Sequence, residues 1–210
     1  AQALAEDERF FHWELEFPIA FYDQDGERRA DAGFDAVIGN PPYINISGLP
    51  ENQRDYLRGS FSETFAGNSD ILYYFMQTGT DILRPGGRQG LIVARYFTQA
   101  RYADGFRQYL LDHSKIEKIV DFGNFQVFPS VDVLTHIFIN THDEEAGEYD
   151  VSILNLIDED FCDNYVRQRL PAEDSSAFSE VDLDSTTLTK HPWNLIDKDT
   201  LYIKQKMEEQ

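Results

Sequence analysis

The chain contains, at residues 34–43, the stretch Phe34-Asp35-Ala36-Val37-Ile38-Gly39-Asn40-Pro41-Pro42-Tyr43. Its apolar run has the β-branched composition of a buried strand. Pro41 and Pro42 end that strand, because proline has a fixed φ and lacks the backbone donor that a sheet or a helix interior needs. The turn leaves carbonyl oxygens free between the amide of Asn40 and the ring of Tyr43. Such a strand end suits a planar ligand that carries an amino group.

The motif Asn40-Pro41-Pro42-Tyr43 is similar to the NPPY motif of S-adenosylmethionine-dependent amino-methyltransferases. The longer phrase at 33–44 resembles the adenine-specific (N6) DNA methyltransferases of restriction–modification systems. The resemblance is greatest to the type II/IIG enzymes, in which methylase and nuclease share one long polypeptide. It implies a Rossmann-like fold, S-adenosylmethionine as cofactor and double-stranded DNA as partner. It also implies nuclease and target-recognition domains in the parent polypeptide.

The rest of the chain alternates predicted helices and strands. Apolar residues at helical spacing, with capping and breaking residues, predict helices at 50–59, 70–83 and 101–114. Apolar runs predict strands at 90–94, 116–122, 133–140 and 151–156, the last as an edge strand. The strands at 116–122 and 133–140 should pair antiparallel, because no helix separates them. The fold class is therefore α/β: parallel strands plus an antiparallel last strand. By resemblance, this is the C-terminal half of a methyltransferase domain, and it is incomplete.

Topology predicts where the site lies. Parallel strands joined by crossover helices end at one edge of a sheet, where α/β enzymes bind their ligands. Tyr43 follows the strand at 34–38, and Phe128 lies in the loop after the strand at 116–122. If these strands are parallel, both rings lie on one rim. By resemblance, the phenylalanine of a Val-Phe-Pro loop packs against a displaced base, so Tyr43 and Phe128 would bracket it; the alternative is that Phe128 belongs to the core.

The catalytic residues implied by the resemblance are Asn40, Pro41, Pro42 and Tyr43. The exocyclic nitrogen of adenine is a poor nucleophile because its lone pair is delocalised, and the base must leave the duplex to be reached. Hydrogen bonds to the Asn40 oxygen and the Pro41 carbonyl would localise that lone pair, while Tyr43 stacks on the ring. The amino nitrogen then attacks the methyl group of the sulfonium in line, so the positioning of the two reactants supplies much of the rate enhancement. Phe75 would line the adenine pocket of the cofactor by resemblance, or else belong to the core.

The charge of the chain is unusual for a protein that acts on DNA. It has 38 acidic and 18 basic residues, a net charge of −20, and only six of the basic residues are lysine. Such a surface repels a polyanion at low salt. Either the DNA-gripping surface lies elsewhere, or the protein works in concentrated salt that screens the charge. The acid-rich, lysine-poor composition favours a halophile.

Composition limits several other functions. The histidines are scattered without ligand spacing, so no metal site is expected. The single Cys162 excludes an internal disulfide, and no apolar run approaches the roughly 20 residues of a membrane span, so we expect a cytoplasmic protein without a membrane partner.

The expected domain organisation has three parts. Residues 1–33 lead into the motif strand, residues 34–157 form the catalytic-domain portion, and residues 158–210 form an acidic surface segment and a linker toward an absent target-recognition domain. Residues 1–33 lack the glycine-rich loop that binds the methionine end of the cofactor in the family, so the main binding loop is expected outside this chain. We expect an excised portion, or a natural split subunit, that transfers methyl groups weakly or not at all alone.

Three alternative functions remain open. Protein-glutamine methyltransferases share the four-residue motif, and cytosine-amino methylation uses a similar chemistry, though serine more often replaces Asn40 there. The third alternative is a non-catalytic DNA-binding or scaffold fragment that retains an inactive site.

Overall fold

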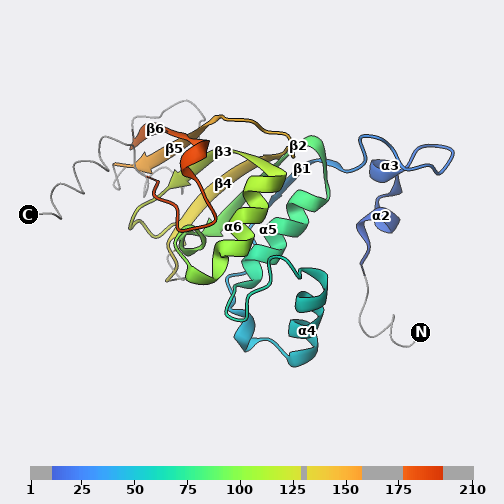
Figure 1. The fold of residues 1–210 in the computed structure, drawn as a ribbon, viewed down its shortest axis with the longest axis horizontal. Helices are drawn as coiled ribbons and strands as arrows, with labels where there is room; N and C mark the ends of the chain where they lie inside the picture. The colour runs from blue at the N-terminus through green and yellow to red at the C-terminus, as the bar shows by residue number, and fades with distance from the viewer. Residues whose placement is uncertain (1–10, 129–131, 158–176, 196–210) are drawn as a thin grey trace, which may run out of the picture.

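A six-stranded sheet forms the centre of the computed structural model, which describes residues 11–128, 132–157 and 177–195 (Figure 1). The strand order is β1-β2-β4-β3-β5-β6. Strands β1, β2, β3 and β5 run in one direction, whereas β4 and β6 are antiparallel to their neighbours. The strand bounds are Phe34–Gly39 (β1), Leu83–Ala94 (β2), Ser114–Asp121 (β3), Thr135–His142 (β4), Asp150–Leu156 (β5) and Phe178–Asp184 (β6).

Helices α5 and α6 cover one face of the sheet, while α2 and α3 extend away from it near the N-terminus (Figure 1). Helix α5 begins where the side chain of Asp70 accepts a hydrogen bond from the Leu72 N–H, which satisfies a backbone donor that a helix start leaves free. The helix bounds are Trp13–Glu16 (α2), Pro18–Phe21 (α3), Glu51–Ser60 (α4), Ile71–Asp81 (α5) and Asp104–His113 (α6).

The two faces of the sheet carry different cores. Because side chains alternate along a strand, Ile119 joins the main core beneath α5 and α6, whereas Val120 joins a smaller cluster on the opposite face. Phe106 and Leu110 of α6 are fully buried in the main core, as their helical spacing predicts. The main core therefore fixes both helices against the sheet.

Strand β4 joins the two halves of the sheet. It pairs antiparallel with β2 on one side and with β3 on the other, so that Phe138 lies opposite both Leu91 and Ile119. The predicted antiparallel pairing of the strands at 116–122 and 133–140 is confirmed. Because β1, β2 and β3 run in the same direction, their carboxyl ends share one rim. The predicted α/β, Rossmann-like fold is likewise confirmed.

Several sequence-based expectations were wrong in detail. The strand at 151–156 is not an edge strand, because β6 pairs along its outer side. Residues 178–184 form that strand, where we expected an acidic surface segment. Residues 158–176 and 196–210 lie outside the described residues. The partly alternating apolar and polar residues at 10–18 predict extended chain, but the N-terminal lead-in contains two short helices, α2 and α3.

The boundary between α5 and β2 also differs from the prediction. The helix was expected to continue through Leu83, but that residue begins β2 and lies opposite Phe34. Strand β1, expected to be buried, has no neighbour on its outer side among the described residues, and Ile38 is 85% exposed. No helix within the described ranges is both long and apolar enough to cross a bilayer.

Candidate functional site

The motif loop and the loop that carries Phe128 leave the same rim of the sheet. Tyr43 lies just beyond the carboxyl end of β1, and Phe128 lies in the loop beyond the carboxyl end of β3. Strands β2 and β4 lie between them, which separates the two strand ends by about 14 Å at the ordinary strand spacing. Strands β1 and β3 therefore run in the same direction, as the bracketing prediction requires. Phe128 is half-buried. The bracketing of a base by the two rings stays a prediction.

Within the motif, Tyr43 and Asn40 contact each other directly. The Tyr43 hydroxyl donates to Asn40 Oδ1 at 3.0 Å and lies 3.2 Å from the carbonyl oxygen of Ile92 in β2. Burial raises the pKa of Tyr43 to about 12, so the hydroxyl keeps its proton at neutral pH. Because an amide oxygen accepts two hydrogen bonds, Asn40 Oδ1 retains acceptor capacity for a ligand. Asn40 is exposed, whereas the adjoining Pro41 is buried.

The chain after the motif is tied to the start of α5. The Ile71 N–H donates to the Ile44 carbonyl at 2.9 Å, and the Ile46 N–H donates to the Ser69 carbonyl at 3.1 Å. The Ile44 N–H donates to the Asp70 carboxylate at 3.2 Å. These bonds fix the exit of the motif loop, and with it the position of Tyr43.

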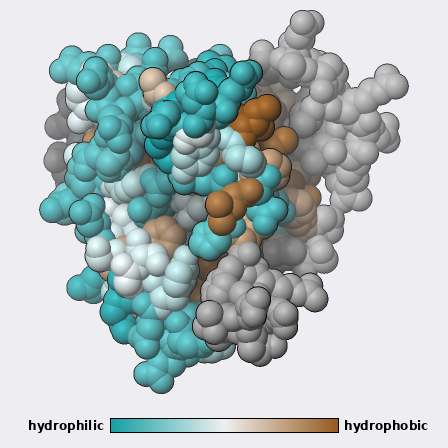
Figure 2. All heavy atoms as spheres, turned by 90° about the vertical axis from the view of Figure 1, so that its right-hand side faces the viewer, coloured by the Kyte–Doolittle hydropathy of each residue, from teal (hydrophilic) through white to brown (hydrophobic). Residues whose placement is uncertain are grey.

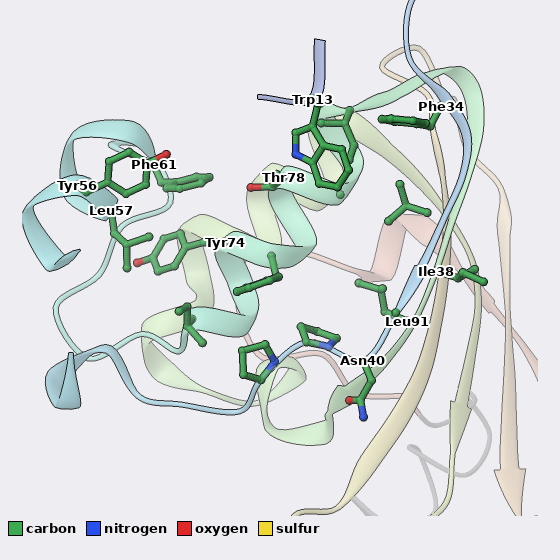
Figure 3. Close-up of a pocket in the computed structure, with 18 of the residues that line it drawn as sticks. Trp13, Phe34, Ile38, Asn40, Tyr56, Leu57, Phe61, Tyr74, Thr78 and Leu91 are labelled. Carbon is green, nitrogen blue, oxygen red and sulfur yellow. The ribbon is translucent and has the colours of Figure 1, made fainter. Parts of the chain in front are cut away.

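An apolar cavity of about 870 Å³ lies beside the motif (Figure 3). Trp13 and Phe34 lie at one end and Asn40 at the other, while Tyr74 and Thr78 of α5 form one wall (Figure 3). Its size falls within the range of small-molecule sites, and such sites are mostly apolar with a few polar groups. Residues of the motif, of β1, of α4 and of α5 thus form a single candidate binding pocket.

Phe75 lines this cavity. Its side chain is 49% exposed, so the ring is accessible instead of being enclosed in the core. The adenine-stacking role implied for Phe75 by resemblance stays a prediction, but the ring is placed where a flat ligand in the cavity can contact it.

A charged cluster lies farther along the rim. Asp121 at the end of β3 lies 3.4 Å from Nε2 of the fully buried His136 in β4 and 3.8 Å from Nη1 of Arg95. Arg95 also donates to the carbonyl of Gly123 at 3.1 Å. Burial acts to raise the pKa of Asp121, but His136, the Gly123 N–H and Arg95 together hold it below its ordinary value. The cluster links the ends of three strands to the start of the loop that carries Phe128.

Sequence reasoning found the motif residues but missed Asp70 and Tyr96 as parts of this region. From the sequence, Asp70 belongs to the stretch Gly67-Asn68-Ser69-Asp70, which predicts only a helix cap. Tyr96 follows β2, and its hydroxyl donates to Asp70 Oδ2 at 2.5 Å. Within the described residues, no group of three or more His, Cys, Asp or Glu side chains is arranged to hold a metal ion.

The strand order, the inserted antiparallel β4 and the motif loop at the rim define a Rossmann-like S-adenosylmethionine-dependent methyltransferase fold. The structure superposes on that of the type IIG restriction endonuclease BpuSI with a TM-score of 0.57 at 15% identity, over 83% of this chain and 22% of that one. At this identity the similarity shows the fold alone.

Residues 1–128 match the family model of the Eco57I restriction-modification methylase, and the chain belongs to this family. It is 33% identical over 107 residues to the type II methyltransferase M.HincII of Haemophilus influenzae, which covers 50% of this chain and 21% of that protein. It is 25% identical over 176 residues to the type II methyltransferase M.BanIII of Aneurinibacillus aneurinilyticus, covering 84% of this chain and 26% of that protein. The chain thus spans about a fifth to a quarter of the length of these relatives. The resemblance to a restriction–modification methylase is confirmed.

Proposed function

We propose that the protein is a DNA methyltransferase that transfers the methyl group of S-adenosylmethionine to the exocyclic amino group of a flipped adenine. One observation carries this proposal: Asn40 Oδ1, held by the Tyr43 hydroxyl, stands at a strand end between an apolar cavity and the rim of the sheet. Membership in a restriction-modification methylase family supports DNA as the substrate.

The residues of the chain have distinct roles in this reaction. Asn40 Oδ1 and the Pro41 carbonyl accept hydrogen bonds from the amino group, which localises its lone pair on nitrogen. Tyr43 stacks on the base, a contact worth about 1–3 kcal/mol. Phe128 is proposed to cover the opposite face of the base. Pro42 keeps the turn rigid, so that the acceptors are in place before the base arrives. The amine becomes acidic once it is alkylated and loses its proton to water.

The cavity beside the motif fits part of the proposed cofactor. A flat, partly apolar group such as an adenine suits an apolar cavity with the accessible ring of Phe75. S-adenosylmethionine supplies the electrophilic methyl group when it is bound. The main loop that would hold its methionine end is proposed to lie outside residues 1–210.

The wider setting is also proposed. Double-stranded DNA is the partner, and a nuclease and a target-recognition domain share the full-length polypeptide, which acts in the cytoplasm. Residues 1–33 are the lead-in to the motif strand, and residues 34–157 belong to the catalytic portion, which also includes β6 because that strand pairs with β5. We expect residues 1–210 alone to transfer methyl groups weakly or not at all.

The test is the Asn40→Ala substitution in the full-length protein. We expect the initial rate of N6-methyladenine formation on unmethylated plasmid DNA, measured by mass spectrometry of the nucleosides, to fall by about 10²–10³-fold, as for loss of one transition-state hydrogen bond. Binding to the same DNA in a mobility-shift assay should stay within about 3-fold, since DNA affinity comes mainly from phosphate contacts.

The matched control is Asn52→Ala, which removes an exposed amide from α4 outside the cavity and should leave the rate unchanged. An unchanged methylation rate in Asn40→Ala would show that Asn40 has no catalytic role. Formation of N4-methylcytosine would show that the substrate base is cytosine and not adenine. Formation of methylated glutamine in a peptide would show that the substrate is protein and not DNA. The absence of any methylated product from the wild type would favour a non-catalytic module.

A further inference from the structure

Asp70 lies at the junction of three segments that meet beneath the motif loop. Its side chain is buried, with 6% of the residue exposed. Oδ1 accepts from the Leu72 N–H at 2.9 Å and from the Ile44 N–H at 3.2 Å, and Oδ2 accepts from the Tyr96 hydroxyl at 2.5 Å. Both carboxylate oxygens are therefore engaged.

The three donors come from parts of the chain that form the site. Ile44 directly follows Tyr43, Leu72 lies in the first turn of α5, and Tyr96 lies just beyond the end of β2 on the shared rim. The Ile71 N–H returns a bond to the Ile44 carbonyl, so the loop exit and the helix start are joined in both directions. A displacement of Asp70 would therefore be transmitted to Tyr43 through one peptide unit.

Helix capping alone does not account for this arrangement. A neutral serine caps a helix as well as aspartate does, and it needs only the bond to Leu72. Burying a carboxylate costs free energy unless its oxygens are hydrogen-bonded. A carboxylate offers about four acceptor positions, which allows one side chain to serve all three donors. The hydrogen bonds to Ile44 and Tyr96 are the two that helix capping does not require.

The hydrogen bond to Asp70 also fixes the position of Tyr96. Its residue is 38% exposed, so part of the ring faces solvent while the hydroxyl is fixed by Asp70. Burial and the adjacent Asp70 carboxylate both raise the pKa of Tyr96, so the hydroxyl remains a donor at neutral pH. The end of β2 is thereby tied to the loop exit.

We propose that Asp70 is a positioning residue for methyl transfer, which holds the Asn40–Tyr43 loop in place by joining it to the start of α5 and to Tyr96. The inference rests on the function proposed above. Asp70 does not touch the substrate; it acts through Ile44 on the stacking ring of Tyr43. A misplacement of about 1 Å at a reacting centre costs about 10²-fold in rate.

Three substitutions in the full-length protein separate positioning from capping. Asp70→Ser keeps a helix cap but is too short to reach Ile44 and Tyr96. Asp70→Asn keeps an oxygen for both backbone donors and places its amide nitrogen toward the Tyr96 oxygen, which can accept. Tyr96→Phe removes only the third bond. The readouts are kcat and KM with unmethylated plasmid DNA, the thermal unfolding midpoint, and hydrogen exchange of the Ile44 amide.

We expect Asp70→Ser to lower kcat by about 10- to 100-fold with KM for DNA within about 3-fold. Its unfolding midpoint should stay within about 3 °C of the wild type, because the cap is retained. Asp70→Asn should restore kcat to within about 3-fold of the wild type, and Tyr96→Phe should fall between the two. The Ile44 amide should exchange at least about tenfold faster in Asp70→Ser than in Asp70→Asn.

Two results would overturn the positioning role. One is wild-type kcat in Asp70→Ser, which would leave Asp70 a helix cap only. The other is an unchanged exchange rate of the Ile44 amide in that variant. Asn52→Ala, at an exposed position of α4, is the control and should change neither readout. Because hydrogen exchange needs no substrate, it reports on the positioning contact even if the wild type methylates no adenine, a result that would instead count against the proposed function.

Discussion

Asp121 shows how a single side chain at the end of β3 links the rim to the stability of the fold. Its carboxylate accepts from the Gly123 N–H at 2.8 Å and contacts His136 and Arg95. Together these partners lower its pKa below the ordinary value in spite of burial. A carboxylate with a lowered folded pKa binds fewer protons in the folded state, so it stabilises the fold above its unfolded pKa of about 3.9.

The pH dependence of unfolding tests this role. Asp121→Asn should lower the free energy of unfolding by about 1–2 kcal/mol at pH 7, because a charge-assisted contact is lost. The difference from the wild type should shrink as the pH falls below about 4 through the lowered folded pKa, where the wild-type carboxylate also becomes neutral. Urea unfolding between pH 2 and pH 7 measures it. Asp25→Asn, in an exposed turn, should leave the curve unchanged; a constant difference for Asp121→Asn at all pH values would contradict the assignment.

At the scale of elements, α5 packs against the sheet through a glycine. A Cβ placed on Gly79 would lie 2.0 Å from Nε2 of Gln89 and 3.4 Å from a methyl carbon of Val37. Gln89 is fully buried, and its Nε2 donates to the Met76 carbonyl in α5 at 3.1 Å. The close approach of helix and sheet therefore depends on the absence of a side chain at this position.

Gly79→Ala should therefore destabilise the protein by about 1–3 kcal/mol, the usual cost of overpacking a core. Gly59→Ala in α4 is the matched control, because a Cβ there meets nothing within 4 Å. Alanine should stabilise that helix by about 0.5–1 kcal/mol. Chemical unfolding of both variants decides the matter, and an equal effect of the two substitutions would contradict the packing role of Gly79.

The same scale shows what the sequence can and cannot predict. The apolar run at 36–38 and the prolines that follow it were sufficient to place β1 and the motif. Strand β6 was missed because aspartate, serine and glutamate fill four of its seven positions, although Val181 and Leu183 alternate toward the core as strand residues do. The early start of β2 was not predictable, since Pro85-Gly86-Gly87 reads as a stop. Leu83 pairs with Phe34 before this stretch, and pairing with β1 resumes at Arg88 after an irregularity.

The site divides in a similar way. Asn40 and Tyr43 are close in sequence, so a local motif identifies them. Asp70 and Tyr96 are 26 residues apart, and their contact follows from the packing of α5 beside β2. The distance between Tyr43 and Phe128 depends on the insertion of β4 between β2 and β3. No local sequence pattern near either residue predicts that insertion.

At the scale of the whole molecule, β1 is an outer strand of the sheet, and no other described strand pairs with its outer side. Exposed apolar side chains gather on the side of the molecule that carries α2, α3 and β1 (Figure 2), and they include Leu15, Ile19 and Ile38. An unpaired edge strand with apolar side chains is a site for pairing with another chain.

Residues 1–210 alone should consequently self-associate. Ile38→Lys should shift the chain toward the monomer in sedimentation velocity, because a charge on an edge strand opposes pairing. Ile157→Lys changes a comparably exposed isoleucine beyond β5 and is the control. Equal effects of the two variants would show that the charge itself, and not the β1 edge, opposes association.

The net charge of −20 gives a second prediction at this scale. If the surface is adapted to concentrated salt, the thermal unfolding midpoint should rise by several degrees between about 0.1 and 2 M KCl, because screening reduces repulsion among the carboxylates. Differential scanning calorimetry in KCl measures the shift. A midpoint that does not change over this range would contradict a halophilic adaptation.

The position of β4 has a consequence for how the protein is made. During synthesis, β1 and β2 leave the ribosome before β3, yet the strand that separates β2 from β3 comes last of the four. Until residue 142 has emerged, β3 has no neighbour on the β2 side, and the two loops of the rim are not held in register. Nascent chains that end before this strand should therefore expose two incomplete sheet edges and depend on chaperones.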